Sequence, residues 1–89
     1  MSNAKLKRIL RERYGGKCSL CGRYLKKEKQ TLHHRQPKSC NGKDTLSNSC
    51  IICEQCSIII HRFKYGSEAY TTLDNAIAKN LKKNDKYEQ

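Results

Sequence analysis

Four cysteines in two closely spaced pairs have the residue type and spacing of a metal site. Cys18 and Cys21 form one C-x-x-C pair, and Cys53 and Cys56 form another. A turn of this kind directs two thiolates at one point, so two such turns complete the tetrahedral four-sulfur site that suits Zn²⁺. Two redox-active pairs and a disulfide framework are the alternatives. We expect a closed, structural zinc site that contributes much of the folding free energy.

Three histidines lie between or just after the cysteine pairs, at His33, His34 and His61. Adjacent side chains of a strand point to opposite sides, so His33 and His34 cannot both ligate one metal in regular strand geometry. One of them can bind a metal while its neighbour faces a substrate. A metal held by imidazole can polarise a phosphate, and a neutral imidazole beside it can take a proton from water. The alternative is that both are solvated surface side chains of a basic protein.

Short elements must position these residues, and the sequence patterns predict them. Apolar residues recur at helical spacing within residues 4–14 and again from about 67 to 82, so we expect a helix toward each end of the chain. Turn residues without an apolar period predict a loop over residues 36–48. Between the two helices the sequence predicts a strand at Thr31–His34, a β-prone run at Ser49–Ile52 and a helix from Cys56 to about Lys64.

The chain has 89 residues, of which only 36% are hydrophobic. A core of this size supplies about 3–5 kcal/mol, so a single domain over residues 1–89 needs a further brace. Binding of zinc by the four paired cysteines would supply this additional stabilisation. Two cysteines remain outside it. Cys50 lies in an apolar run and is expected to be a small buried hydrophobe, whereas Cys40 lies in a polar loop and is expected to be a free thiol.

Membrane and export segments are not expected in this sequence. The longest purely aliphatic run is Ile58–Ile60, which is far too short to cross a membrane. The first thirteen residues are interrupted by basic side chains and hold no apolar stretch of the length that an export signal needs. We therefore expect a cytoplasmic protein, in which paired cysteines bind metal rather than form disulfides.

Positive charge is concentrated away from the middle of the chain. The formal net charge is +11, of which residues 1–30 carry +8 and residues 31–61 only +1. Phosphate contacts provide affinity that does not depend on base sequence, so this pattern favours nucleic acid as the partner. An anionic membrane surface is disfavoured, because no apolar face is rich in aromatic residues. The candidate phosphate-binding residues are Lys5, Lys7, Arg8, Arg11, Lys26, Lys27 and Lys29, with Arg35 and Lys38 beside the histidine pair.

The order of these motifs resembles the HNH endonuclease family. The matching stretches are Leu32-His33-His34-Arg35-Gln36-Pro37, Asn41-Gly42-Lys43-Asp44, Leu46-Ser47-Asn48, and the second cysteine pair followed by His61. They span about residues 17–64, with the order and spacing of the elements preserved. The resemblance implies an α+β fold, in which a small zinc-stabilised ββα-metal domain, also called the His-Me finger, has flanking helices.

The resemblance also implies a role for each matching residue. His33 would be a ligand of a catalytic divalent metal, and His34 would be the general base that activates water. Asn48 would hold the loop and thereby orient the base, because a side-chain amide can bridge two backbone groups. His61 would be a further metal ligand, and the four paired cysteines would hold the structural zinc.

Ser57 departs from the family pattern. The position directly after the second cysteine pair usually carries a metal-binding His or Asn in the family, and in this chain it is Ser57. Ser57 and His61 are four residues apart on the expected helix and share a face, so His61 can still reach the metal. A serine hydroxyl is a poor ligand for a divalent ion. The catalytic site would therefore have two good protein ligands and more water.

Together with the charge, the resemblance predicts a metal-dependent endonuclease that hydrolyses DNA phosphodiester bonds with low intrinsic sequence specificity. Its catalytic ion would be Mg²⁺, Mn²⁺, Ni²⁺ or Zn²⁺, in addition to the structural Zn²⁺. Similar small proteins occur in bacterial and phage settings, where a protein partner or a homodimer would direct the enzyme to its target. The alternative is a zinc-stabilised nucleic-acid-binding protein that kept the fold and lost the catalysis.

Overall fold

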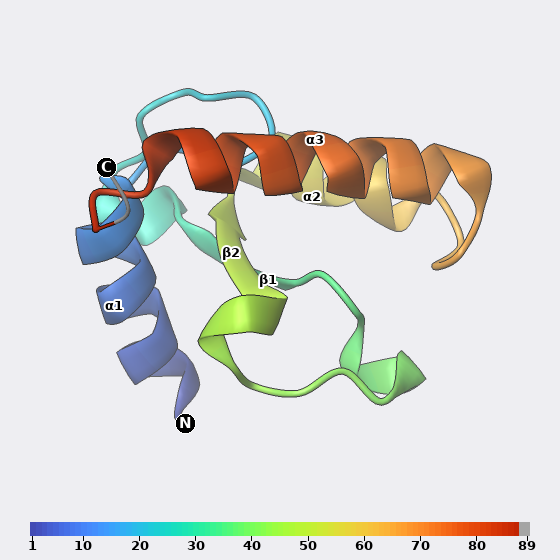
Figure 1. Cartoon of the computed structure of the whole chain (residues 1–89), viewed down its shortest axis with the longest axis horizontal. Helices are drawn as coiled ribbons and strands as arrows, with labels where there is room; N and C mark the ends of the chain where they lie inside the picture. The colour runs from blue at the N-terminus through green and yellow to red at the C-terminus, as the bar shows by residue number, and fades with distance from the viewer. Residues whose placement is uncertain (88–89) are drawn as a thin grey trace.

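The computed structural model describes residues 1–87, in which three helices surround a two-stranded antiparallel sheet (Figure 1). The fold is therefore α+β, as the sequence predicts. In chain order the helices and strands are α1 (Asn3–Tyr14), β1 (Thr31–His34), β2 (Ser49–Ile52), α2 (Glu54–His61) and α3 (Glu68–Asn84). Short 3₁₀ turns lie at η1 (Lys27–Lys29), η2 (Lys38–Cys40) and η3 (Leu46–Asn48).

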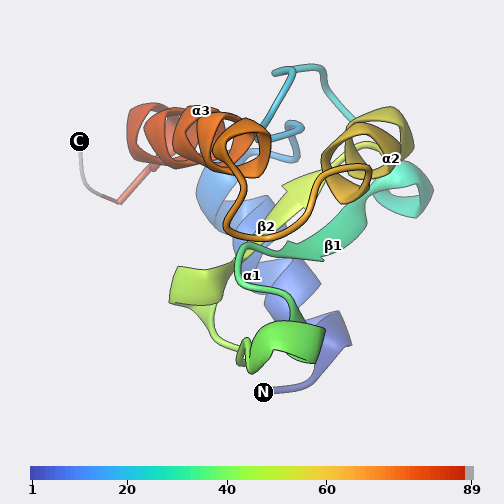
Figure 2. The same ribbon diagram turned by 90° about the vertical axis from the view of Figure 1, so that its right-hand side faces the viewer.

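The hairpin of β1 and β2 is the platform for the histidine pair. Its register places His33 opposite Cys50 and His34 opposite Ser49. Side chains alternate along a strand and directly paired residues point the same way, so His33 and His34 face opposite sides of the hairpin. α1 lies on one side of the hairpin, and α2 and α3 lie on the other (Figure 2).

The core lies between the hairpin and the pair of helices α2 and α3. Its buried cluster consists of Cys18, Cys50, Ile52, Cys53, Cys56, Ile60, Tyr70 and Ile77. Half of these residues are cysteines, so the aliphatic part of this cluster is small. A small aliphatic core is consistent with the expectation that a metal site must add to the stability of the fold. Cys50 is fully buried within the cluster, as predicted, whereas Cys40 is partly exposed in the loop.

α1 covers the other face of the hairpin, where it packs against β2. Leu6 and Leu10 are the fully buried side chains of this amphipathic helix. Ser2 caps its start, because the Ser2 hydroxyl accepts a hydrogen bond from the backbone N–H of Lys5. Gly15 ends it in the left-handed conformation at φ 80°. The helix starts one residue before the predicted position, and of its basic residues Lys5 and Arg8 are exposed whereas Lys7, Arg11 and Arg13 are half-buried.

α2 differs from the predicted helix, which ran from Cys56 to about Lys64. It begins earlier, at Glu54, because the sulfur of Cys53 caps it and accepts a hydrogen bond from the backbone N–H of Cys56. It ends earlier, at His61, and the backbone then continues through a tighter turn in which Phe63 N–H bonds to the Ile60 carbonyl. The second cysteine pair consequently lies at the start of the helix that carries His61.

α3 begins after Ser67, whose hydroxyl accepts a hydrogen bond from the backbone N–H of Tyr70, as expected of an N-cap. It ends at Asn84, two residues beyond the predicted end. The side-chain amide of Asn80 donates to the Ser19 carbonyl at 2.8 Å and ties α3 to the first cysteine loop. Within residues 1–87, no helix combines the length and the apolar character needed to cross a membrane.

Candidate active site and metal centres

The four paired cysteines converge on one point, as the sequence predicts. Their sulfur atoms all lie within 4.8 Å of one another, and the sulfurs of Cys21 and Cys53 are 3.9 Å apart. A Zn²⁺ ion bonded to four sulfurs at about 2.3 Å requires separations of this order. The residues present therefore fit a structural zinc ion.

The first cysteine loop is shaped by backbone donors aimed at a sulfur. The Cys18 sulfur accepts hydrogen bonds from the backbone N–H groups of Leu20, Cys21 and Cys53. Burial opposes ionisation of the Cys18 thiol, but the three amides outweigh it and lower its pKa from 9.0 to about 7. Thiolate is the form that binds a metal, so the loop is preorganised for one. Ser19 N–H also bonds to the Ile51 carbonyl at 2.8 Å, which holds the loop against β2.

His33 is buried and its ring is not hydrogen-bonded to any residue that the structure describes. Its side chain lies on the α2 side of the hairpin, only 2% of the residue is exposed, and neither ring nitrogen has a hydrogen-bond partner in the described part of the chain. Burial, followed by the charge of nearby His61, lowers the pKa of His33 to about 4, so its imidazole is neutral. An unsatisfied buried polar atom costs about 1–3 kcal/mol and requires an explanation. A neutral imidazole with a free lone pair is suited to a metal ion, which would satisfy this side chain.

His61 lies beside His33, where the two rings make an edge contact with centroids 5.6 Å apart. His61 is exposed, and its Nδ1 is 3.2 Å from the hydroxyl of Ser57 one helical turn earlier. Ser57 therefore holds one nitrogen of His61, and Nε2 is left for a ligand. In the described part of the chain, the four paired cysteines are the one group of three or more His, Cys, Asp or Glu side chains close enough to share an ion. His33 and His61 thus lie side by side, with the hydroxyl of Ser57 beside His61.

His34 faces away from that pair and contacts a carboxylate. Its Nε2 is 2.7 Å from Oδ1 of Asp44, and Oδ2 of Asp44 accepts a hydrogen bond from Lys38 Nζ at 3.0 Å. Lys38, and after it His34, lower the pKa of the Asp44 carboxyl, so this group is a carboxylate and can only accept. The proton of a neutral His34 therefore lies on Nε2. The other nitrogen, Nδ1, keeps its lone pair and can accept a proton.

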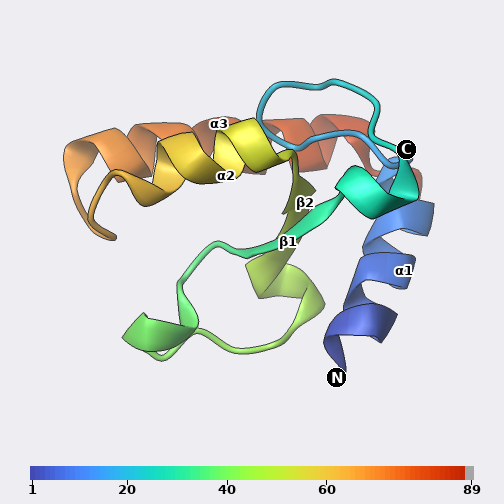
Figure 3. The same ribbon diagram turned by 180° about the vertical axis from the view of Figure 1, so that it is seen from behind.

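Asn48 holds the loop that joins β1 to β2, which projects away from α2 and α3 (Figure 3). Its side-chain oxygen accepts from the Gln36 N–H at 2.9 Å, and its amide donates to the carbonyls of Gln36 and Lys43 at 3.1 and 3.0 Å. Gly42 completes the closure, because a Cβ there would lie 1.7 Å from the Gln36 carbonyl oxygen. These bonds hold Gln36, two residues after His34, against the segment that carries Asp44.

Two of the residues expected to bind phosphate have carboxylate partners. Arg35 makes two hydrogen bonds to Asp74 of α3, at 3.0 and 3.1 Å, and its carbonyl accepts from the Tyr70 hydroxyl at 2.7 Å. Lys38 is paired with Asp44. Arg35 therefore joins the end of β1 to α3, and both cations would have to exchange partners to reach a phosphate.

The other expected phosphate-binding residues lie on two surfaces. Arg8, Arg11 and Lys27 line one groove together with Lys5 and Lys7. Lys26 and Lys29 line a second hollow beside the first cysteine loop. The sequence identifies each of these residues as a candidate for phosphate binding, but it does not indicate which of them share a surface.

Asp44 and Asp74 are the site residues that the sequence analysis misses. Asp44 lies in the expected loop, and its contact with His34 depends on how that loop closes. The sequence offers one hint of the Asp44–His34 contact. A loop that joins two paired strands must return to the end of the first strand, and His34 is the last residue of that strand. Asp74 is 39 residues from Arg35 in sequence and carries no local signal.

Comparison with known proteins agrees with this geometry. A family model described as HNH endonuclease matches residues 18–63. No curated protein matches the chain. The family match covers just over half of the chain, begins at the first cysteine of the four-cysteine cluster and ends two residues after His61. This protein therefore belongs to the HNH endonuclease family.

Proposed function

We propose that this protein is a divalent-metal-dependent endonuclease that hydrolyses phosphodiester bonds in DNA. Membership of the family indicates a nuclease or nucleic-acid-binding function. The arrangement of His33 and His34 favours the nuclease. Neither nitrogen of the buried His33, which lies beside His61, has a hydrogen-bond partner among the described residues, whereas His34, one residue later, is paired with a carboxylate. A protein that only binds nucleic acid needs neither feature.

His34 is the proposed general base. Its Nδ1 lone pair accepts a proton from the attacking water, while Asp44 accepts the Nε2–H bond and stabilises the imidazolium that forms. Asp44 is therefore a positioning residue for His34. It keeps the ring in the tautomer and orientation that leave Nδ1 available.

His33 and His61 would hold the catalytic divalent ion, which is Mg²⁺, Mn²⁺, Ni²⁺ or Zn²⁺ in this proposal. When bound, such an ion neutralises charge on the phosphate and on the departing 3′ oxygen. Burial keeps His33 neutral and ready to donate its lone pair, and the Ser57 hydroxyl holds the ring of His61. Asn48 closes the loop that places Asp44 against His34.

Supercoiled plasmid provides the test. The zinc-loaded protein is incubated with plasmid and each of the four ions in turn, and nicking is measured on gels. Nicking is expected with at least one ion, and His34→Ala is expected to abolish it. The His34→Ala protein should retain the zinc content and circular dichroism of the wild type. Nicking by His34→Ala at the wild-type rate would contradict the assignment of the base.

A nucleic-acid-binding protein without catalysis is the second candidate, and the serine at position 57 favours it. Ser57 leaves two imidazoles where the family usually has a further ligand. Tight, salt-dependent DNA binding without nicking in any ion would support this candidate over the nuclease.

A further inference from the structure

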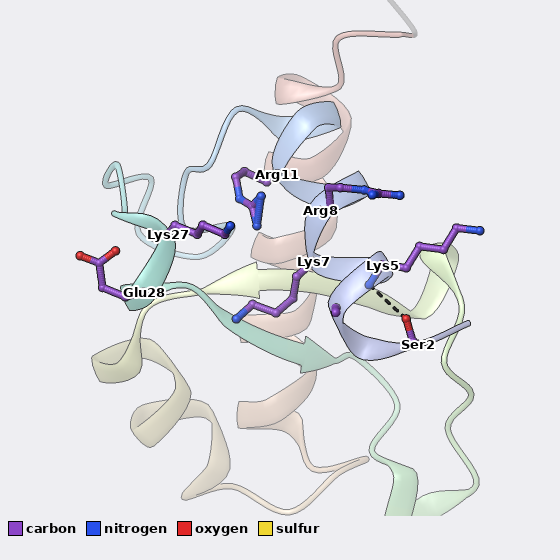
Figure 4. Close-up of a pocket in the computed structure, with 8 residues that line it drawn as sticks. Ser2, Lys5, Lys7, Arg8, Arg11, Lys27 and Glu28 are labelled. Carbon is purple, nitrogen blue, oxygen red and sulfur yellow. Dashed lines mark hydrogen bonds between the residues drawn. The ribbon is translucent and has the colours of Figure 1, made fainter.

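α1 and η1 enclose an open groove of about 890 Å³ on the surface of the molecule (Figure 4). Its lining residues are Ser2, Ala4, Lys5, Lys7, Arg8, Arg11, Lys27 and Glu28. Five of these are cationic and one is acidic. Among the residues that the structure describes, none of the five cations forms an ion pair with a carboxylate. A groove with so much uncompensated positive charge raises the local concentration of polyanions.

The wall on the α1 side is fixed to the segment that carries η1. Arg11 donates from Nε to the side-chain oxygen of Gln30 at 3.1 Å, and the Gln30 amide donates to the Leu25 carbonyl at 3.0 Å. Gln30 is 5% exposed, so its end of this bridge is shielded from water, while Arg11 is half-buried. Gly16 allows it, because a Cβ at that position would lie 3.3 Å from the Gln30 amide nitrogen. The cations of the groove are thus carried on two elements whose separation is fixed.

The groove lies on the same side of the hairpin as His34. α1 covers the face of the sheet opposite to α2 and α3 (Figures 2 and 4). Strand alternation directs His34 toward the α1 face and His33 toward the α2 face. A strand lying in the groove would therefore approach the proposed base without crossing the hairpin. α1 also lies outside residues 18–63, so the main wall of the groove is not part of the matched family unit.

We propose that the α1–η1 groove binds the phosphate backbone of duplex DNA outside the scissile bond. This inference rests on the proposed function, because it adds a backbone contact to the same enzyme. Among the described residues, the lining holds five Lys or Arg side chains, the carboxylate of Glu28 and no aromatic ring. Proteins that bind single strands use aromatic side chains as stacking platforms, so a lining without them favours contact with the backbone of a duplex. The contact carries no base specificity.

Binding of a fluorescent 30-base-pair duplex at a series of salt concentrations tests the groove. The full chain is used in a His34→Ala background without added divalent ion, so that loss of cleavage does not affect the result. Lys7→Gln with Lys27→Gln removes two charges from the groove. Lys79→Gln with Lys82→Gln removes two exposed lysines from α3, on the opposite side of the hairpin, and is the matched control.

The groove variant should reduce the slope of log K against log salt by about 1.8, which is about 0.9 for each lost phosphate contact. Its affinity at low salt should fall about tenfold or more, and the control should lose much less. Equal losses in the two variants would show that only net charge matters and would overturn the inference. An unchanged slope in the groove variant would overturn it as well.

A third arm separates this inference from the nuclease proposal. A single-stranded oligonucleotide of the same sequence should show a smaller difference between the groove variant and the control than the duplex does. An equal or larger difference on the single strand would overturn the assignment to duplex DNA. If the nuclease proposal is wrong, the wild-type protein will not nick plasmid. The binding measurements do not depend on cleavage, so they still test the groove in that case.

Discussion

The Nε2 atom of His34 lies 2.7 Å from Oδ1 of Asp44. This contact connects the end of β1 with the loop that returns to β2, and it assigns the proton of a neutral His34 to Nε2. The histidine that faces the α1 side of the hairpin is therefore held by a carboxylate. Neither ring nitrogen of its neighbour His33, on the α2 side, has a hydrogen-bond partner within residues 1–87.

Replacing Asp44 with Asn should slow the reaction without weakening substrate binding. The amide still accepts a hydrogen bond from Nε2 but does not stabilise the imidazolium that forms as His34 takes a proton. We expect kcat to fall about ten- to a hundredfold, with KM nearly unchanged. Lys38→Gln removes the other partner of Asp44 and is the control, with a much smaller effect on kcat. A rise in KM with unchanged kcat would instead place Asp44 in substrate binding.

Replacing Ser57 with His should strengthen binding of the catalytic ion. A third imidazole would stand one helical turn before His61, and imidazole is a far better ligand than a hydroxyl. We expect the concentration of Mn²⁺ or Ni²⁺ at half-maximal nicking to fall about tenfold or more. Ser57→Ala is the matched control, and it should raise that concentration because His61 loses its hydrogen bond. If both variants behave like the wild type, residue 57 does not face the ion.

The buried His33 should make stability depend on pH in the absence of the catalytic ion. Its pKa is about 4 in the folded chain and 6.5 when unperturbed, so below pH 6.5 the unfolded state binds the extra proton. The free energy of unfolding should be at its full value above about pH 6.5. It should fall as the pH drops toward 4, by on the order of 1 kcal/mol per pH unit. Urea unfolding at several pH values measures this dependence.

His33→Leu provides the control for that experiment, because leucine cannot take up a proton. Acid also weakens the binding of zinc by thiolates, but that effect is common to both chains. The difference in unfolding free energy between wild type and His33→Leu should therefore change with pH between 6.5 and 4. A constant difference would mean that His33 is not buried in its neutral form.

Loss of one zinc-binding cysteine should unfold the chain, whereas loss of the loop cysteine should not. Cys53→Ser removes a proposed ligand, while the serine hydroxyl can still cap α2, so the expected loss of bound zinc and of the cooperative thermal transition would be due to the ligand. Cys40 is partly exposed and outside the cluster, so Cys40→Ser should change the unfolding free energy by about 0.5 kcal/mol or less. Zinc content and thermal circular dichroism measure both outcomes. A cooperative, zinc-free Cys53→Ser protein would contradict the brace.

Local sequence patterns predicted the helices and strands well where these elements are determined by residues close to them in the sequence. The strand at Thr31–His34 and the β-prone run at Ser49–Ile52 are both observed and pair as a hairpin. The end helices were placed to within two residues, because each has a serine or glycine at an end that stops or starts it. The boundaries of α2 were wrong, because the signal that starts this helix is a cysteine sulfur acting as a cap, which is not a common N-cap residue.

By itself, the sequence determined that the two cysteine pairs have the spacing of a metal site and that His33 and His34 face opposite sides of their strand. Both properties follow from spacing within one turn or one strand. The tertiary structure alone decided that Asp44 holds His34, that Asp74 holds Arg35, and that cations from α1 and η1 share a groove. Those contacts join residues from separate elements. Their existence depends on how the loop closes and how α1 and α3 dock, which no local spacing encodes.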